Sequence, residues 1–191
     1  RDADAAMYRA KESGKARYEI FDRDMHVRNM NLLQVEMDLR HAVERREFEV
    51  LYQPIVALDS GSIREFEALI RWRHPKHGLV GPNEFVHVAE ETGLIIPIGK
   101  WILEESCRQI VRWQENFEHP LSISVNLSAK QLMHPNLTQY VAAILTETRL
   151  DPRQLKLEVT ETNVMEHSER ALAVLNALDK LGISLSTDDF G

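Results

Sequence analysis

The sequence predicts an α/β fold in which strands and helices alternate around a (β/α) barrel. Segments of strand type and helix type alternate from residue 48 onward, as in βαβ units with a mainly parallel sheet. The predicted strands are apolar on one face only, whereas a doubly wound sheet would give nearly continuous apolar strands. With 43% hydrophobic and 28% charged residues, the composition is that of an ordinary globular protein.

The amino-terminal part is predicted to precede the barrel. Residues 2–13 are predicted to form a helix that ends at Gly14, and residues 16–21 a short strand. Apolar residues at helical spacing among charges predict a long connecting helix over 24–46. The barrel elements follow. They are strands 48–54, 63–72, 121–127, 155–159 and 183–187, and helices 82–116, 132–148 and 168–181.

A length of 191 residues allows one domain, or one domain and part of another, and excludes two complete enzyme domains. The chain has no initiator Met, and it stops at Gly191 directly after a predicted strand. We therefore expect a fragment that is cut at both ends.

Charge and composition exclude several classes of function. The net charge of −7 argues against binding of a nucleic acid polymer through a basic surface. The single cysteine, Cys107, allows neither an intrachain disulfide nor a Cys-x-x-Cys zinc site, and we expect a buried thiol in a reducing compartment. The chain has no apolar run of membrane-spanning length and no signal peptide, so we expect a cytoplasmic protein.

Polar residues recur on one face of successive predicted strands, near their carboxyl ends. They are Glu67, Asn126, Glu158 and Asp188. Barrel enzymes place their active sites at these strand ends. Carboxylate and amide oxygens suit Mg²⁺ or Mn²⁺, and the adjacent Asp189 could bridge two ions. A two-metal site would indicate phosphoryl chemistry.

Each of these residues also has an ordinary interpretation. A lone strand Glu is usually solvated, a lone Asn is often a cap, and Asp188-Asp189 could begin a loop. The His74-x-x-His77 spacing could suggest a metal site, but the Pro and Gly around it favour an exposed loop. Trp101 and Trp113 are expected to pack in the core.

Five linked motifs, spread over about 140 residues, resemble the EAL-domain cyclic di-GMP phosphodiesterases. They are Tyr52-Gln53-Pro54-Ile55, Glu67-Ala68-Leu69-Ile70-Arg71-Trp72, Ser124-Val125-Asn126-Leu127-Ser128, Glu158-Val159-Thr160-Glu161 and Asp188-Asp189-Phe190-Gly191. Residues 1–22 resemble the carboxyl-terminal end of a GGDEF diguanylate cyclase domain. The resemblance therefore divides the chain into a GGDEF end (1–22), a linker helix (23–46) and the first part of an EAL domain (47–191).

The resemblance implies a TIM-like barrel that hydrolyses cyclic di-GMP to linear pGpG with Mg²⁺ or Mn²⁺, with Ca²⁺ as an inhibitor. It implies metal ligands at Glu67, Asn126, Glu158, Asp188 and Asp189, and substrate contacts at Gln53, Leu69 and Arg71. Glu161 resembles the glutamate that anchors a loop next to the site. A homodimer, and upstream GGDEF and sensory domains that could include a membrane anchor, are also implied.

The family's catalytic lysine, a further glutamate and a last substrate-binding segment would follow Gly191, so we expect no turnover by these residues alone. Two other functions stay open. One is a cyclic di-GMP receptor that binds without cleaving, and the other is an unrelated Mg²⁺-dependent barrel enzyme that stabilises an enolate.

Overall fold

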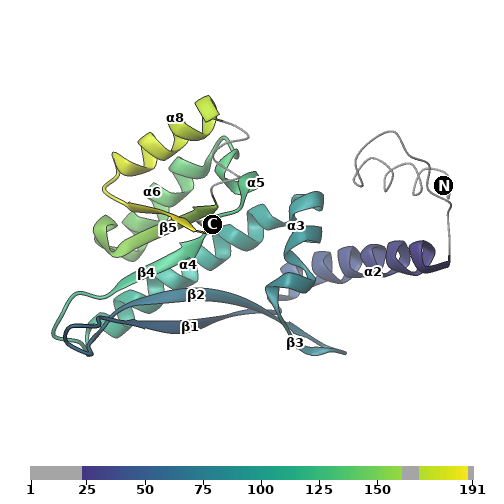
Figure 1. The fold of residues 1–191 in the computed structure, drawn as a ribbon, viewed down its shortest axis with the longest axis horizontal. Helices are drawn as coiled ribbons and strands as arrows, with labels where there is room; N and C mark the ends of the chain where they lie inside the picture. The colour runs from purple at the N-terminus through teal and green to yellow at the C-terminus, as the bar shows by residue number, and fades with distance from the viewer. Residues whose placement is uncertain (1–22, 161–167, 189–191) are drawn as a thin grey trace.

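The computed structural model describes residues 23–160 and 168–188 (Figure 1). Helix 2–13, strand 16–21, Glu161 and Asp189 lie outside the described residues. Asp188 is described only in its backbone. Among the described helices, none combines the length and the apolar character needed to span a membrane.

A mixed sheet forms the centre of the described chain. Its strands are β1 (Phe48–Val56), β2 (Ile63–His74), β3 (Gly78–Val80), β4 (Ser122–Asn126), β5 (Leu155–Thr160) and β6 (Ser184–Asp188). The order is β1-β2-β4-β5-β6, and β3 pairs with the end of β2. The predicted parallel arrangement is confirmed for β2, β4, β5 and β6. Over the described residues the sheet is an open wall with β1 and β6 at its edges.

Strand β1 runs antiparallel to β2, which differs from the mainly parallel sheet expected. Only a short turn separates Val56 from Ile63, and a parallel crossover needs a dozen or more residues. Gly61, with φ of 68°, lies in this turn. The short connection therefore dictates a hairpin at this edge.

Two of the predicted helices are broken. The stretch 82–116 contains a 3₁₀ turn (Pro82–Glu84), α3 (Val86–Thr92) and α4 (Ile95–Gln114). Gly93 ends α3 in the left-handed conformation, with φ of 79°. The stretch 132–148 is replaced by α5 (Ala129–Leu132) and α6 (Leu137–Thr148), and Ser128 and Gln131 cap α5 reciprocally.

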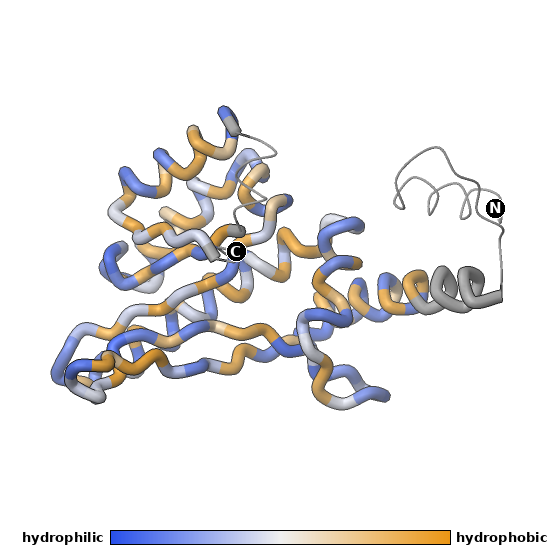
Figure 2. The backbone as a smooth tube through the Cα atoms, in the orientation of Figure 1, coloured by the Kyte–Doolittle hydropathy of each residue, from blue (hydrophilic) through white to orange (hydrophobic). Residues whose placement is uncertain are grey.

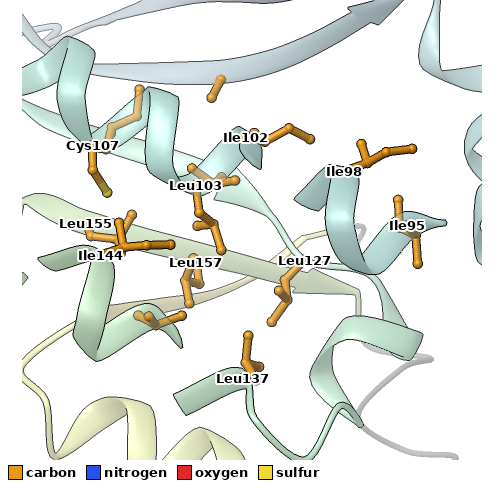
Figure 3. Close-up of a cluster of buried hydrophobic side chains, with 14 of the residues drawn as sticks. Ile95, Ile98, Ile102, Leu103, Cys107, Leu127, Leu137, Ile144, Leu155 and Leu157 are labelled. Carbon is orange, nitrogen blue, oxygen red and sulfur yellow. The ribbon is translucent and has the colours of Figure 1, made fainter. Parts of the chain in front are cut away.

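The helices α4, α6 and α8 (Ser168–Asp179) cover one face of the sheet (Figure 1). The hydrophobic core lies between these helices and the sheet. Figure 3 shows Leu103 and Cys107 of α4 near Leu155 and Leu157 of β5. Cys107 is fully buried, and burial raises the pKa of its thiol to about 12, which confirms the expected buried thiol. Trp101 and Trp113 pack against this core, as expected.

Helix α2 (Arg23–Arg45) confirms the long helix predicted over 24–46, and it extends away from the sheet (Figure 1). Hydrophobic and hydrophilic residues alternate along the coloured, carboxyl-terminal part of this helix (Figure 2). Leu39 and Ala42 are fully buried, whereas Leu33 and Met37 are exposed. The carboxyl-terminal half of α2 is therefore anchored on the domain, where it contacts α3.

The prediction that His74 lies in an exposed loop is wrong. Strand β2 continues to His74, which is 6% exposed and pairs with Gly78 of β3. Its Nδ1 accepts hydrogen bonds from the backbone N–H groups of Lys76 (3.0 Å) and His77 (3.3 Å). The imidazole thus closes the turn of a hairpin.

Candidate active site

Sheet register aligns the polar residues that the sequence analysis selected. Glu67 of β2 lies opposite Ser124 of β4, and Asn126, two residues further along β4, lies opposite Glu158 of β5. In β6, Asp188 lies opposite Thr160. Asn126, Glu158 and Asp188 lie at or near the carboxyl ends of their parallel strands. The same position was expected for Glu67 and is wrong, because β2 continues beyond it to His74, where it pairs with β3.

Alternation along the strands directs these side chains away from the helices. In β4, Ile123 and Val125 are buried in the core. Ser124 and Asn126 therefore belong to the opposite face. Glu67 is half-buried between the buried Phe66 and Ala68. The period of two seen in the sequence thus places these residues on one face.

A direct hydrogen bond joins two of the candidate ligands. Asn126 donates from Nδ2 to Oε1 of Glu67 at 3.0 Å, across the β2–β4 pair. Because the amide nitrogen binds the carboxylate, the carbonyl Oδ1 is the atom of Asn126 that can bind a cation. Glu158 lies beside Asn126, and both line a cavity of about 450 Å³.

The donor atoms of this set suit a hard divalent cation. Glu67 and Glu158 supply carboxylate oxygens, and Asn126 supplies an amide oxygen. In the described part of the chain, no group of three or more His, Cys, Asp or Glu residues could hold a metal ion. The other carboxylates predicted for this site belong to Asp188 and Asp189, whose side chains lie outside the described part of the structure.

The predicted substrate residues lie on the hairpin of β1 and β2. Gln53 of β1 is directly opposite Glu67, and Leu69 lines the cavity. Arg71 is half-buried and donates from Nη1 to the carbonyl oxygen of Ile70 at 2.8 Å. It lies about 13 Å beyond Glu67 along the strand, at the usual rise per residue.

The opposite wall of the cavity contains polar residues that the sequence analysis did not select. They are Asn83, His87, Glu90 and Gln131. Burial raises the pKa of Glu90, partly offset by His87, Lys130 and a hydrogen bond with Ser128. The spacing of residues 83, 87 and 90 matches one helical face, which was the available signal.

An ion pair lies on the same face, nearer the amino ends of the strands. Lys156 of β5 places its Nζ 2.5 Å from Oε1 and 2.7 Å from Oε2 of Glu65 of β2. The two side chains are 30% and 15% exposed. Neither residue was selected from the sequence. The sequence did offer a sign of them: each lies two residues before a candidate ligand on its strand, and therefore on the same face.

Comparison with known families identifies the chain. The model of the EAL domain family matches residues 36–191. The bifunctional diguanylate cyclase/cyclic di-GMP phosphodiesterase MucR of Pseudomonas aeruginosa is 43% identical over 190 residues, which cover 100% of this chain and 28% of MucR. The cyclic di-GMP phosphodiesterase PdeR of Escherichia coli is 36% identical over 191 residues, with 100% and 29% covered. The chain thus spans less than a third of either relative.

Solved structures confirm an EAL-type fold. The PaMucR phosphodiesterase in complex with c-di-GMP has a TM-score of 0.79 and 44% identity, over 83% of this chain and 64% of that one. The FimX EAL domain from Pseudomonas aeruginosa bound to c-di-GMP has a TM-score of 0.73 and 29% identity, over 82% and 62%.

Proposed function

The chain belongs to the EAL domain family, and on that premise we propose that its protein hydrolyses cyclic di-GMP to linear pGpG with Mg²⁺ or Mn²⁺. The observation that carries the proposal is the hydrogen bond between Asn126 and Glu67, beside Glu158, on the strand-end face of the sheet. The similarity to two cyclic di-GMP phosphodiesterases and to a c-di-GMP complex supports it.

The proposed cation ligands are Glu67, Asn126, Glu158, Asp188 and Asp189. A bound divalent cation supplies an activated water and stabilises developing charge on phosphate oxygens. Asn126 orients the carboxylate of Glu67, because its amide donates to one of the two oxygens. Ca²⁺ is expected to bind the same oxygen ligands and to inhibit.

Gln53, Leu69 and Arg71 are the proposed substrate contacts. The guanidinium of Arg71 is partly fixed by the carbonyl of Ile70, which leaves further N–H groups of its fork for a phosphate. Leu69 lines the cavity next to Asn126 and offers an apolar surface to a base or ribose. We assign Glu161 the role of anchoring the loop after Asp188 and Asp189.

We extend the proposal to the organisation of the protein. Residues 1–22 would end a GGDEF domain, 23–46 would form the linker helix, and 47–191 would begin the EAL domain. The naming of MucR as both cyclase and phosphodiesterase supports the presence of both kinds of domain. A cytoplasmic homodimer that receives signals from upstream domains is the expected assembly.

Chromatography of the nucleotide products tests the reaction. The protein that carries this chain should convert cyclic di-GMP to pGpG with Mg²⁺, and Glu67→Gln should abolish the product. Glu115→Gln, on an exposed residue after α4, is the matched control and should leave the rate unchanged. Tight nucleotide binding without any product would instead indicate the non-catalytic receptor.

The isolated residues 1–191 provide a separate measurement. The resemblance places a catalytic lysine after Gly191, so we expect these residues alone to form no more pGpG than their Glu67→Ala variant. Product above that control would contradict this expectation.

A further inference from the structure

Lys156 and Glu65 lie beneath the proposed cation site and outside the five motifs that carry the family resemblance. Their ammonium and carboxylate form a two-oxygen contact at 2.5 and 2.7 Å. Both side chains are mostly shielded, at 30% and 15% exposed. Such a pair is screened less than one on an open surface.

Register gives Lys156 a second carboxylate within its row. Lys156 lies opposite Ser124, and Ser124 lies opposite Glu67, so Lys156 and Glu67 occupy one row, two strands apart. Glu65 lies about 7 Å further toward the amino end of β2. The ammonium nevertheless binds Glu65, while the carboxylate of Glu67 turns to Asn126 in the next row.

Ser124 allows the lysine side chain to cross β4. It stands between Lys156 and Glu67, it is fully buried, and it is the smallest polar side chain that the row could hold. Its hydroxyl makes no hydrogen bond within the described chain. The ammonium of Lys156 therefore makes its hydrogen bonds with Glu65, and the hydroxyl of Ser124 does not share in them.

We propose that Glu65 is a positioning residue that holds the ammonium of Lys156 away from Glu67 and so preserves the cation affinity of the site. An ammonium paired with Glu67 would compete with a divalent cation for the same oxygens. This inference rests on the proposed function, because it assumes that Glu67 binds the cation.

Mn²⁺ binding, followed by the electron paramagnetic resonance signal of free Mn²⁺, tests the inference without measuring turnover. In the protein that carries this chain, Glu65→Gln should raise the Kd for Mn²⁺ about tenfold, the lower end of the usual effect of outer ligands. Lys156→Met should leave the Kd unchanged or lower it. The double variant should regain the wild-type Kd. Glu49→Gln, which removes the carboxylate that pairs with Arg73, is the matched control and should have no effect.

The signs of these effects separate the possible outcomes. If the pair only supports the fold, both single variants will change the Kd alike or not at all, and the inference is overturned. Should Glu65→Gln fail to fold, Lys156→Met decides, because weaker Mn²⁺ binding contradicts the inference. If the wild-type protein binds Mn²⁺ and Glu65→Gln binds equally well, this inference alone fails. If the wild-type protein binds no Mn²⁺, the proposed cation site fails with it.

Discussion

Asn126 links the backbone geometry of the sheet to the chemistry proposed for the site. Its amide reaches from β4 to Glu67 on β2, and it stands opposite Glu158 on β5. Its side chain therefore links β4 to β2, beside the β5 position that holds Glu158. A carboxylate held by such a donor is oriented, as ligands of metal sites commonly are by their hydrogen-bond partners.

Removing this amide should impair the site without unfolding the protein. We expect Asn126→Ala to lower kcat of the proposed hydrolysis about 10- to 100-fold, because Glu67 loses its donor and the cation loses an oxygen ligand. Steady-state kinetics at several Mg²⁺ concentrations provide the measurement. Asn116→Ala, at an exposed position after α4, is the control. An unchanged kcat in Asn126→Ala would remove Asn126 from the proposed site.

Arg71 and Arg73 lie two residues apart on the same face of β2 but differ in exposure and in charge partner, so they separate substrate binding from general charge. Arg71 is half-buried on the site face, whereas Arg73 is exposed and pairs with Glu49. With Ca²⁺ to prevent turnover, Arg71→Ala should weaken cyclic di-GMP binding about 10- to 100-fold, as expected for a lost charged hydrogen bond. Arg73→Ala should bind normally. Calorimetry gives both values, and equal losses would refute the assignment.

Site residues could be predicted from the sequence where the two-residue period of a strand alone decides which face a side chain is on. Glu67, Asn126 and Glu158 alternate with buried apolar neighbours, so their face could be inferred. The polar wall with Asn83, His87 and Glu90 could not be inferred in this way. Their spacing places them on one helical face, but the packing of the 3₁₀ turn and α3 decides that this face lines the cavity.

Among the secondary-structure elements, the long and strongly patterned ones were predicted best. Helix α2 and strands β2, β4, β5 and β6 all have clear periodicity. Strand β3 is only three residues long and exists through pairing with β2, so composition alone suggested a loop. The breaks in helices 82–116 and 132–148 depend on a left-handed glycine and on capping.

The glycine that ends α3 can be tested against a second glycine. Gly93 has φ of 79°, so Gly93→Ala should cost about 1 kcal/mol in the free energy of unfolding through backbone strain alone. Gly81 has φ of −80°, and a Cβ there would also meet open space. Gly81→Ala should therefore be neutral or slightly stabilising. Urea unfolding measures both changes, and similar values would argue against strain at Gly93.

At the scale of the whole molecule, two buried acidic groups and one half-buried acidic group predict sensitivity to alkali. Burial raises the pKa of Cys107, Tyr52 and Tyr140 to about 12, from ordinary values of 9.0 for the thiol and 10.0 for the phenols. Between those values the unfolded chain loses protons that the folded chain keeps. The free energy of unfolding should therefore fall as pH rises from about 9 to 12.

Chemical denaturation across this pH range measures the effect, and Cys107→Ala should make the decline less steep. The same burial predicts that the native Cys107 thiol does not react with a thiol reagent at neutral pH. Rapid labelling of the folded protein would contradict the buried position.

The antiparallel direction of β1 determines where helix α2 joins the domain. Phe48, the first residue of β1, pairs with Trp72 near the carboxyl end of β2, and Arg46 marks the bend before it with φ of 56°. A force carried along α2 would therefore enter the sheet near the carboxyl end of β2, the strand that also holds Glu67. Trp72 and Glu67 are only about 16 Å apart along this one strand, so a displacement of α2 could reach Glu67 through β2 alone.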